Sequence, residues 1–131
     1  MSNKVTPFLM FEGRAEEAMN FYVSLFADSE IRDISRYGSG EAGPEGTIER
    51  ANFTVAGQYV VCTDSPIQHA FSFTPSFSFF VECDSEEELD TAFNELSDSG
   101  DILMPPDNYG FSRKFTFVSD RFGVSWQLNL R

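Results

Sequence analysis

The chain has 131 residues and a mass of 14.8 kDa, a length that predicts a single domain over residues 1–131. Its formal net charge of -12 would repel phosphates over most of the surface, so we expect no nucleic-acid partner. No apolar run approaches the length of a membrane span, and residues 1–13 lack the apolar region of a signal peptide. We therefore expect no contact with a membrane and a cytoplasmic location.

The first half of the chain contains one predicted helix among four predicted strands. Turn-bounded apolar segments predict the strands, which lie at 4–11, at 29–38 and, as a pair, within 47–64. The helix is expected at 13–26, where apolar residues recur at helical spacing. The pair within 47–64 is joined at Ala56-Gly57, which indicates a hairpin. This half therefore has the order β-α-β-β-β.

The second half repeats that order. Its predicted strands lie at 76–83, 101–106, 113–120 and 124–130. A helix is expected at 85–97, with Asp84 or Ser85 as its N-cap and Gly100 after its end. Internal repeats over about 1–66 and 71–131 follow from this pattern. Because one helix covers only one face of each sheet, the sequence predicts an α+β fold. In that fold, two βαβββ repeats form a cup-like, eight-stranded mixed sheet with the helices outside.

Alternation along the strands separates core positions from positions that would line the cup. Trp126 and Phe79 are expected to be buried under a helix. The same reasoning places Phe8 and Met10 on the helix side of the first strand, with Leu9 facing inward. For the strand within 76–83 and the last strand, the inward residues are Ser76, Ser78 and Phe80, and Ser125, Gln127 and Asn129.

Polar residues on these inward faces are the candidate ligand-binding residues. The full set also includes two tyrosines as aromatic neighbours of these residues. Its members are Arg50, Asn52, Tyr59, Ser76, Ser78, Tyr109, Ser125 and Gln127. Aromatic walls with a few polar groups are typical of small-molecule sites. Arg50, if it faces inward, favours a carboxylate or phosphate on the ligand. The alternative interpretation is that these residues form a face that is simply solvated.

No cofactor is predicted from the residues. A methyl donor usually binds at a glycine-rich turn between a strand and a helix. Here the glycine-rich stretch within 38–46 lies between two expected strands. The two cysteines, Cys62 and Cys83, lack CxxC spacing and are interpreted as reduced, buried thiols.

Several stretches together resemble a known family. They are "TPFLMFEGRAEEAMNFYVSLF", "FTVAGQYVVCTDSP", "FTPSFSFFVECDSEEELD" and "SDRFGVSWQLNL". The chain resembles the vicinal oxygen chelate superfamily, which has the glyoxalase and bleomycin-resistance fold, and within it the PhnB-like, 3-demethylubiquinone-9 3-methyltransferase-like group. The resemblance implies paired βαβββ units, a small-molecule ligand and a homodimer.

The resemblance also gives the positions that bind metal in enzymes of the superfamily. They fall on Pro7, near Val61, on Ser76 or Ser78, and on Gln127. Only the amide of Gln127 could serve as a weak ligand, so we expect no metal site.

Three functions remain open from the sequence. The first is a non-catalytic protein that binds a small molecule in the cup, and the second is an enzyme acting on a small, aromatic or anionic metabolite. Acid-base candidates for the enzyme are Asp64, Tyr59 and Tyr109, although Asp64 before Pro66 is also typical of a turn acid. The single histidine, His69, lies in a connection. The third function is an interaction protein whose phenylalanines supply an interface.

Overall fold

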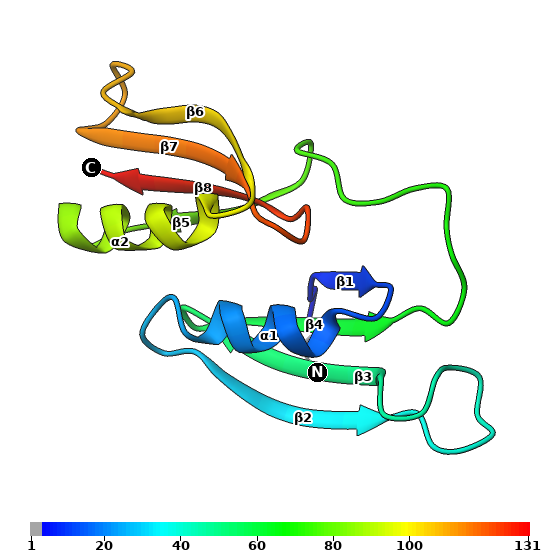
Figure 1. Ribbon diagram of the computed structural model, residues 1–131. Coiled ribbons are helices and arrows are strands. Elements are labelled where there is room, and N and C mark those ends of the chain that lie inside the picture. Colours follow the sequence, from blue (N-terminus) through cyan, green and yellow to red (C-terminus); the bar gives the residue numbers. More distant parts are fainter. Residues whose placement is uncertain (1–3) are drawn as a thin grey trace. The chain divides into compact units, whose positions relative to one another are not determined.

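The computed structural model describes residues 4–131, which form two compact units divided between His69 and Ala70. Each unit contains one helix and four strands (Figure 1). The first unit comprises β1 (Phe8–Phe11), α1 (Ala15–Val23), β2 (Glu30–Arg36), β3 (Ile48–Val55) and β4 (Gln58–Asp64). The second comprises β5 (Ser78–Glu82), α2 (Glu86–Ser97), β6 (Asp101–Asp107), β7 (Lys114–Ser119) and β8 (Ser125–Leu130). The predicted element order is confirmed.

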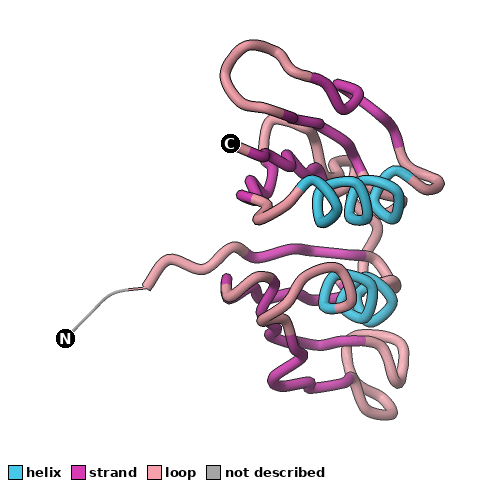
Figure 2. The backbone as a smooth tube through the Cα atoms, turned by 90° about the vertical axis from the view of Figure 1, so that its left-hand side faces the viewer, coloured by secondary structure: helices cyan, strands magenta, loops and turns pink. Residues whose placement is uncertain are grey.

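The two units have the same sheet topology. The strand order is β1-β4-β3-β2 in the first sheet and β5-β8-β7-β6 in the second. In each unit the first and last strands pair in parallel, and the remaining pairs are antiparallel. Figure 2 shows each helix against the strands of its own unit. The predicted fold of two βαβββ repeats is thus confirmed, and its strands form two four-stranded mixed sheets.

The hairpin between β3 and β4 follows from its turn residues. Ala56 and Gly57 both have positive φ angles, of 47° and 82°. Two consecutive positive φ angles give the turn twist that matches the twist of the flanking strands. The sequence prediction of a hairpin at this dipeptide is confirmed.

The start of helix α1 is capped by a carboxylate at the end of β4. Its N-cap residue, Arg14, makes no side-chain cap. Instead, Oδ1 of Asp64, at the end of β4, accepts hydrogen bonds from the backbone N–H groups of Gly13 (2.8 Å) and Ala15 (2.9 Å). This carboxylate pairs the N–H of Ala15, one of those that a helix leaves unpaired at its start, and it fixes α1 to the end of β4.

Helix α1 ends at Val23, three residues before the predicted end. The N–H groups of Ser24 and Leu25 bond carbonyls three residues back, and the Ser24 hydroxyl donates to the carbonyl of Phe21. The last turn therefore tightens, which is common where a helix terminates.

Helix α2 begins at a side-chain cap that the sequence predicts. The Ser85 hydroxyl accepts from the N–H of Glu88 at 3.1 Å, and Glu88 in turn accepts from the N–H of Asp84 at 2.7 Å. Lys114 of β7 bridges to the first turns of the helix through Glu86 (3.0 Å) and Asp90 (2.7 Å). These contacts identify the face of the second sheet on which α2 lies.

The cores lie between each helix and its own sheet. In the first unit, Tyr22 of α1 stacks on Phe53 of β3, with ring centroids 6.2 Å apart. In the second, Trp126 is fully buried and its ring centroid lies 4.8 Å from that of Phe79. The predicted burial of Trp126 is confirmed, and Phe79 is half-buried. The indole N–H of Trp126 donates to Asp120 at 3.0 Å, which removes the cost of burying it.

The predicted faces of the first strand are wrong. Leu9 and Phe11 are 3% and 5% exposed, whereas Phe8 is 53% exposed. Leu9 pairs with Cys62, so it lies on the helix side of the sheet, and Phe8 and Met10 lie on the other side. All four residues of β1 are apolar, so alternation carried no information about its faces.

None of the helices within residues 4–131 is long and apolar enough to cross a bilayer.

Candidate functional site

One face of the first sheet carries no helix, and we call it the helix-free face of the first unit. Register defines it: Asn52 of β3 lies beside Val61 of β4, which lies beside Phe8 of β1. These residues alternate with Phe53, which packs against α1. The sequence prediction that Asn52 faces away from the helix agrees with this register.

A pocket of about 300 Å³ opens on this face, and we call it the first-unit pocket. Its lining consists of Lys4, Thr6, Arg32, Asp33, Asn52, Tyr59 and Val61. Two of the residues predicted to bind a ligand, Asn52 and Tyr59, are therefore brought together. Arg50 occupies the same face of β3, opposite Ser35, and is not part of this lining.

A bulge explains why two consecutive residues of β2 line the pocket. Ile31 pairs with Phe53, and the residue before Phe53 in β3, Asn52, pairs with Asp33. Arg32 is the extra residue of this irregular step, so strict alternation is interrupted there. Arg32 and Asp33 can therefore both reach the pocket.

Two cations lie close to the aromatic ring of Tyr59. The Lys4 ammonium is 4.5 Å from the ring centroid and the Arg32 guanidinium carbon is 5.4 Å from it. Both distances are within the range of cation–π attraction. Arg32 also donates to Glu30 at 2.9 Å. Sequence reasoning missed both cations, because the faces of the strand predicted over 4–11 were inverted and no local signal marks the bulge at Arg32.

The helix-free face of the second unit carries three of the predicted polar residues. The amide of Gln127 donates to the Ser78 hydroxyl at 2.7 Å. Both residues were predicted to lie on the inward face, which agrees with this bond. The hydroxyl of Ser125 is buried and lies 2.9 Å from that of Ser119. Phe80 pairs with Gln127 in the β5–β8 register and is 54% exposed. This face thus combines paired polar groups with an exposed aromatic ring.

The remaining two predicted residues make local contacts. Ser76 precedes β5, and its hydroxyl lies 2.7 Å from that of Thr74. The Tyr109 hydroxyl donates to the carbonyl of Pro105 at 2.6 Å, and its ring meets Phe115 edge-on. Both residues are thereby held by their own segments.

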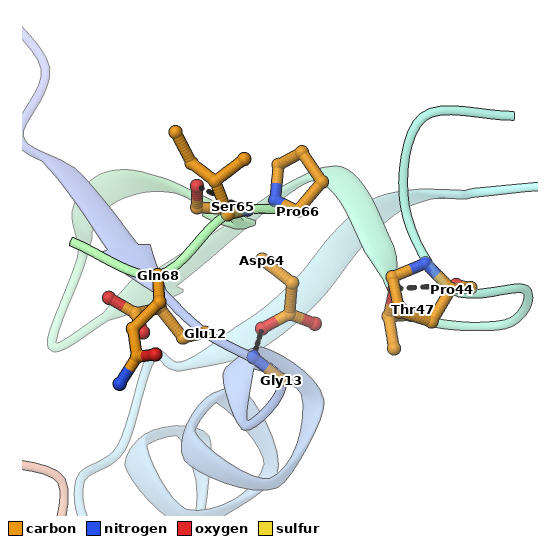
Figure 3. A pocket seen from close by; sticks show the side chains of 9 residues that line it. Glu12, Gly13, Pro44, Thr47, Asp64, Ser65, Pro66 and Gln68 are labelled. Carbon is orange, nitrogen blue, oxygen red and sulfur yellow. Dashed lines mark hydrogen bonds between the residues drawn. The ribbon is translucent and has the colours of Figure 1, made fainter.

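A second pocket of about 260 Å³ lies at the end of β4 (Figure 3). Figure 3 shows the Asp64 carboxylate directed at Gly13, with the side chains of Glu12 and Gln68 nearby. Besides its two bonds at the start of α1, Asp64 accepts from the N–H of Ile48 at 3.0 Å through its other oxygen. A carboxylate with three backbone N–H donors has a structural role. Asp64 was expected to bond the backbone of its own turn. It instead bonds the start of α1 and the first residue of β3.

His69 lies at the side of this second pocket. Its Nε2 is 2.7 Å from the hydroxyl of Ser65, and its backbone N–H donates to Glu12 at 3.3 Å. The bond to Glu12 fastens the connection after β4 to the end of β1, and the bond to Ser65 lies within the connection. The connection itself, residues 65–77, contains neither helix nor strand.

The four positions that the resemblance associates with metal do not fit a metal ion. They supply a proline, the valine side chain of Val61, the hydroxyl of Ser76 or Ser78 and the amide of Gln127, and Ser78 and Gln127 bond each other. Zinc and iron sites use three or four imidazole, thiolate or carboxylate ligands. Within residues 4–131, no three His, Cys, Asp or Glu side chains are grouped so that they could hold a metal.

The glycine-rich stretch within 38–46 joins β2 to β3. It therefore offers no helix N-terminus for the anionic groups of a bound cofactor. This segment does not fit a methyl-donor site of that kind.

Comparisons with known proteins agree on one family. A model of the family described as 3-demethylubiquinone-9 3-methyltransferase matches residues 3–129. The PhnB protein from Bacillus cereus is 55% identical, with a TM-score of 0.95 over 98% of this chain and 100% of that one. Protein YjdN from Escherichia coli is 25% identical over 96% of this chain and 94% of its own length.

More distant structures share the fold alone. A glyoxylase/bleomycin resistance protein/dioxygenase domain from Frankia is 16% identical, with a TM-score of 0.64 over 99% of this chain and 92% of that one. The fosfomycin resistance protein FosX from Listeria monocytogenes, solved with Mn(II) and sulfate, is 12% identical, with a TM-score of 0.62 over 100% of this chain and 93% of that one.

Proposed function

Because this chain belongs to the family described as 3-demethylubiquinone-9 3-methyltransferase and resembles the PhnB protein over nearly its whole length, we propose that it binds a small organic molecule in the first-unit pocket. The binding uses side-chain contacts alone, without a metal ion. The helix-free face of the second unit is a separate candidate surface for a small molecule.

The observation that carries this proposal is the composition of the first-unit pocket. Asn52 offers an amide with both donor and acceptor, while Tyr59 and Val61 offer apolar surface. A few convergent polar groups among apolar ones are the usual features of a small-molecule site. The lining also holds two cations beside the Tyr59 ring, and these add hydrogen-bond donors to the pocket.

The helix-free face of the second unit has polar groups of its own for a small molecule. Gln127 and Ser78 already satisfy one another, so they are held in fixed positions. The Oδ1 of Asn129 is buried and accepts no hydrogen bond from residues 4–131, while its amide nitrogen donates to Glu82 at 3.2 Å. A buried acceptor of this kind gains from a donor on a ligand or from water.

Thermal shift against a library of small metabolites tests the proposal. A ligand that binds only the folded protein raises its melting temperature as its concentration rises above Kd. Hits are repeated on Asn52→Ala, which removes the pocket amide, and on Asn94→Ala, a matched change at an exposed position of α2.

The expected result is a concentration-dependent shift that Asn52→Ala reduces and Asn94→Ala leaves intact. A library without hits, or hits that the two variants bind as well as the parent protein, would contradict the proposal.

A further inference from the structure

The first-unit pocket gathers positive charge in a strongly acidic chain. The protein has 9 basic and 21 acidic residues. The charged residues of the lining are nevertheless Lys4, Arg32 and Asp33, two cations and one anion. The lining thus carries a net charge of +1 (2 - 1) in a protein whose net charge is -12. Basic residues thus outnumber acidic ones in this lining, the reverse of the chain as a whole.

The two cations have donors to spare. Within residues 4–131 the Lys4 ammonium has no carboxylate within ion-pair distance, and its contact is the Tyr59 ring at 4.5 Å. Arg32 donates to Glu30 through Nη1, at 2.9 Å. A guanidinium has five N–H donors, so further donors of Arg32 remain for a ligand. Tyr59 holds both cations beside the pocket without neutralising either of them.

From this arrangement we infer that the first-unit pocket binds the carboxylate of a small organic monoanion. The inference rests on the proposed function and names the chemical class of its ligand. A carboxylate matches the planar fork of Arg32 and the ammonium of Lys4. A monoanion adds one negative charge beside the Lys4 ammonium, which is unpaired within residues 4–131, whereas a dianion would add a second one beside Asp33 and Glu30.

The rest of the pocket sets the size and character of the ligand. A volume of about 300 Å³ is at the lower end for organic ligands, so the molecule is small. Val61 and the Tyr59 ring contact its apolar body, and the amide of Asn52 bonds a polar substituent. Benzoate has the required charge and a suitable size, and benzamide is its uncharged counterpart.

Nuclear magnetic resonance titration with matched pairs of probes tests the inference. The pairs are acetate with acetamide, propionate with propionamide, and benzoate with benzamide. The side-chain amide of Asn52 reports occupancy of the pocket. In each responding pair the carboxylate should bind at least about tenfold tighter than the amide, since hydrogen bonds to a charged acceptor are the stronger ones.

Two arginine variants separate the pocket from general attraction by charge. Arg32 and Arg14 each pair with a nearby glutamate, at 2.9 Å and 3.1 Å, and their side chains are 43% and 50% exposed. Arg32→Gln should weaken carboxylate binding roughly fivefold, the size of effect expected for a partly exposed charge pair. Arg14→Gln makes the same change of net charge on the helix side and should leave affinity unchanged.

The outcomes distinguish this inference from the proposed function. Equal binding of carboxylates and amides in the pocket would overturn the inference and leave small-molecule binding intact. Equal losses in the two arginine variants would also overturn it, because the attraction would then come from overall charge. If no probe of either kind, nor any library molecule, perturbed the pocket, both the inference and the proposed function would fall.

Discussion

Individual side chains divide into those that hold the fold and those that remain available to a ligand. Asp64 belongs to the first group, since both of its oxygens are bonded by backbone N–H groups. Asn52 and Tyr59 belong to the second, because they line a pocket. The type of residue does not tell the two groups apart. What distinguishes them is whether the polar atoms of a side chain already have partners within the protein.

Replacing Asp64 with asparagine should destabilise the fold. The new amide group would place N–H donors against the N–H of Ile48, while its remaining oxygen serves Gly13 and Ala15 less strongly. Hydrogen bonds to a charged group typically contribute more than neutral ones, so we expect a loss of about 1–3 kcal/mol in the free energy of unfolding. Urea denaturation measures it, with the exposed Asp101→Asn as control. Equal stabilities of the two variants would show that Asp64 does not hold α1.

The thiols of Cys62 and Cys83 should be unreactive in the folded protein. Burial, assisted by nearby carboxylates, raises the pKa of each from an ordinary 9.0 to about 12. At pH 8 this lowers the thiolate fraction about a thousandfold. Ellman's reagent should therefore titrate both thiols promptly only in denaturant. Prompt reaction of either thiol in native buffer would contradict the burial described here.

The same pKa values predict a dependence of stability on pH. Between about pH 9 and pH 12 the thiols ionise in the unfolded chain but not in the folded one. Their contribution to stability is therefore fully present below pH 9 and declines as the pH rises through this window.

Sequence reasoning found part of the candidate site for reasons visible in single residues. Asn52 was predicted because a polar residue in an alternating strand must face away from the core. Lys4 and Arg32 were not predicted, because the faces of the strand expected over 4–11 were inverted and Arg32 lies at a bulge. A bulge depends on the pairing of two strands, and the sequence of one strand does not reveal it.

At the scale of helices and strands, the order of elements could be predicted almost completely. The Ala56-Gly57 turn and the cap of α2 have strong local signals, and both are confirmed. The faces of β1 could not be predicted, since its four residues are all apolar. The end of α1 was also missed, because its last turn tightens through bonds that have no distinct sequence pattern.

The cap of α2 gives a test at this scale. The Ser85 hydroxyl accepts from the N–H of Glu88, and its removal leaves that donor unpaired. Ser85→Ala should lower the free energy of unfolding by about 1 kcal/mol, the usual cost of losing an N-cap. Chemical denaturation measures the effect, and Ser72→Ala in the exposed connection is the control. If the two variants were equally stable, α2 would not depend on this cap.

At the scale of the whole molecule, the family resemblance and the exposed aromatic residues lead us to expect a homodimer. Phe8, Phe77, Phe80 and Phe111 are each more than half exposed. Large apolar side chains of this kind are typical of surfaces that associate. Light scattering should give 29.6 kDa, twice the 14.8 kDa of one chain.

Salt should strengthen this association. Two copies with a net charge of -12 repel each other, and added salt screens the repulsion. The dimer fraction should therefore rise with ionic strength. A monomer mass at tens of micromolar protein, in low and high salt alike, would contradict the expectation of a homodimer.

The central claim is that a small molecule binds on the helix-free face of the first unit. The most direct measurement is a two-dimensional amide spectrum of the ¹⁵N-labelled protein, recorded with and without a ligand found by thermal shift. We predict that the largest changes occur in the side-chain amide of Asn52 and the backbone amides of Tyr59 and Val61. Changes confined to Ile67 and Gln68, which line the pocket at the end of β4, would contradict the account.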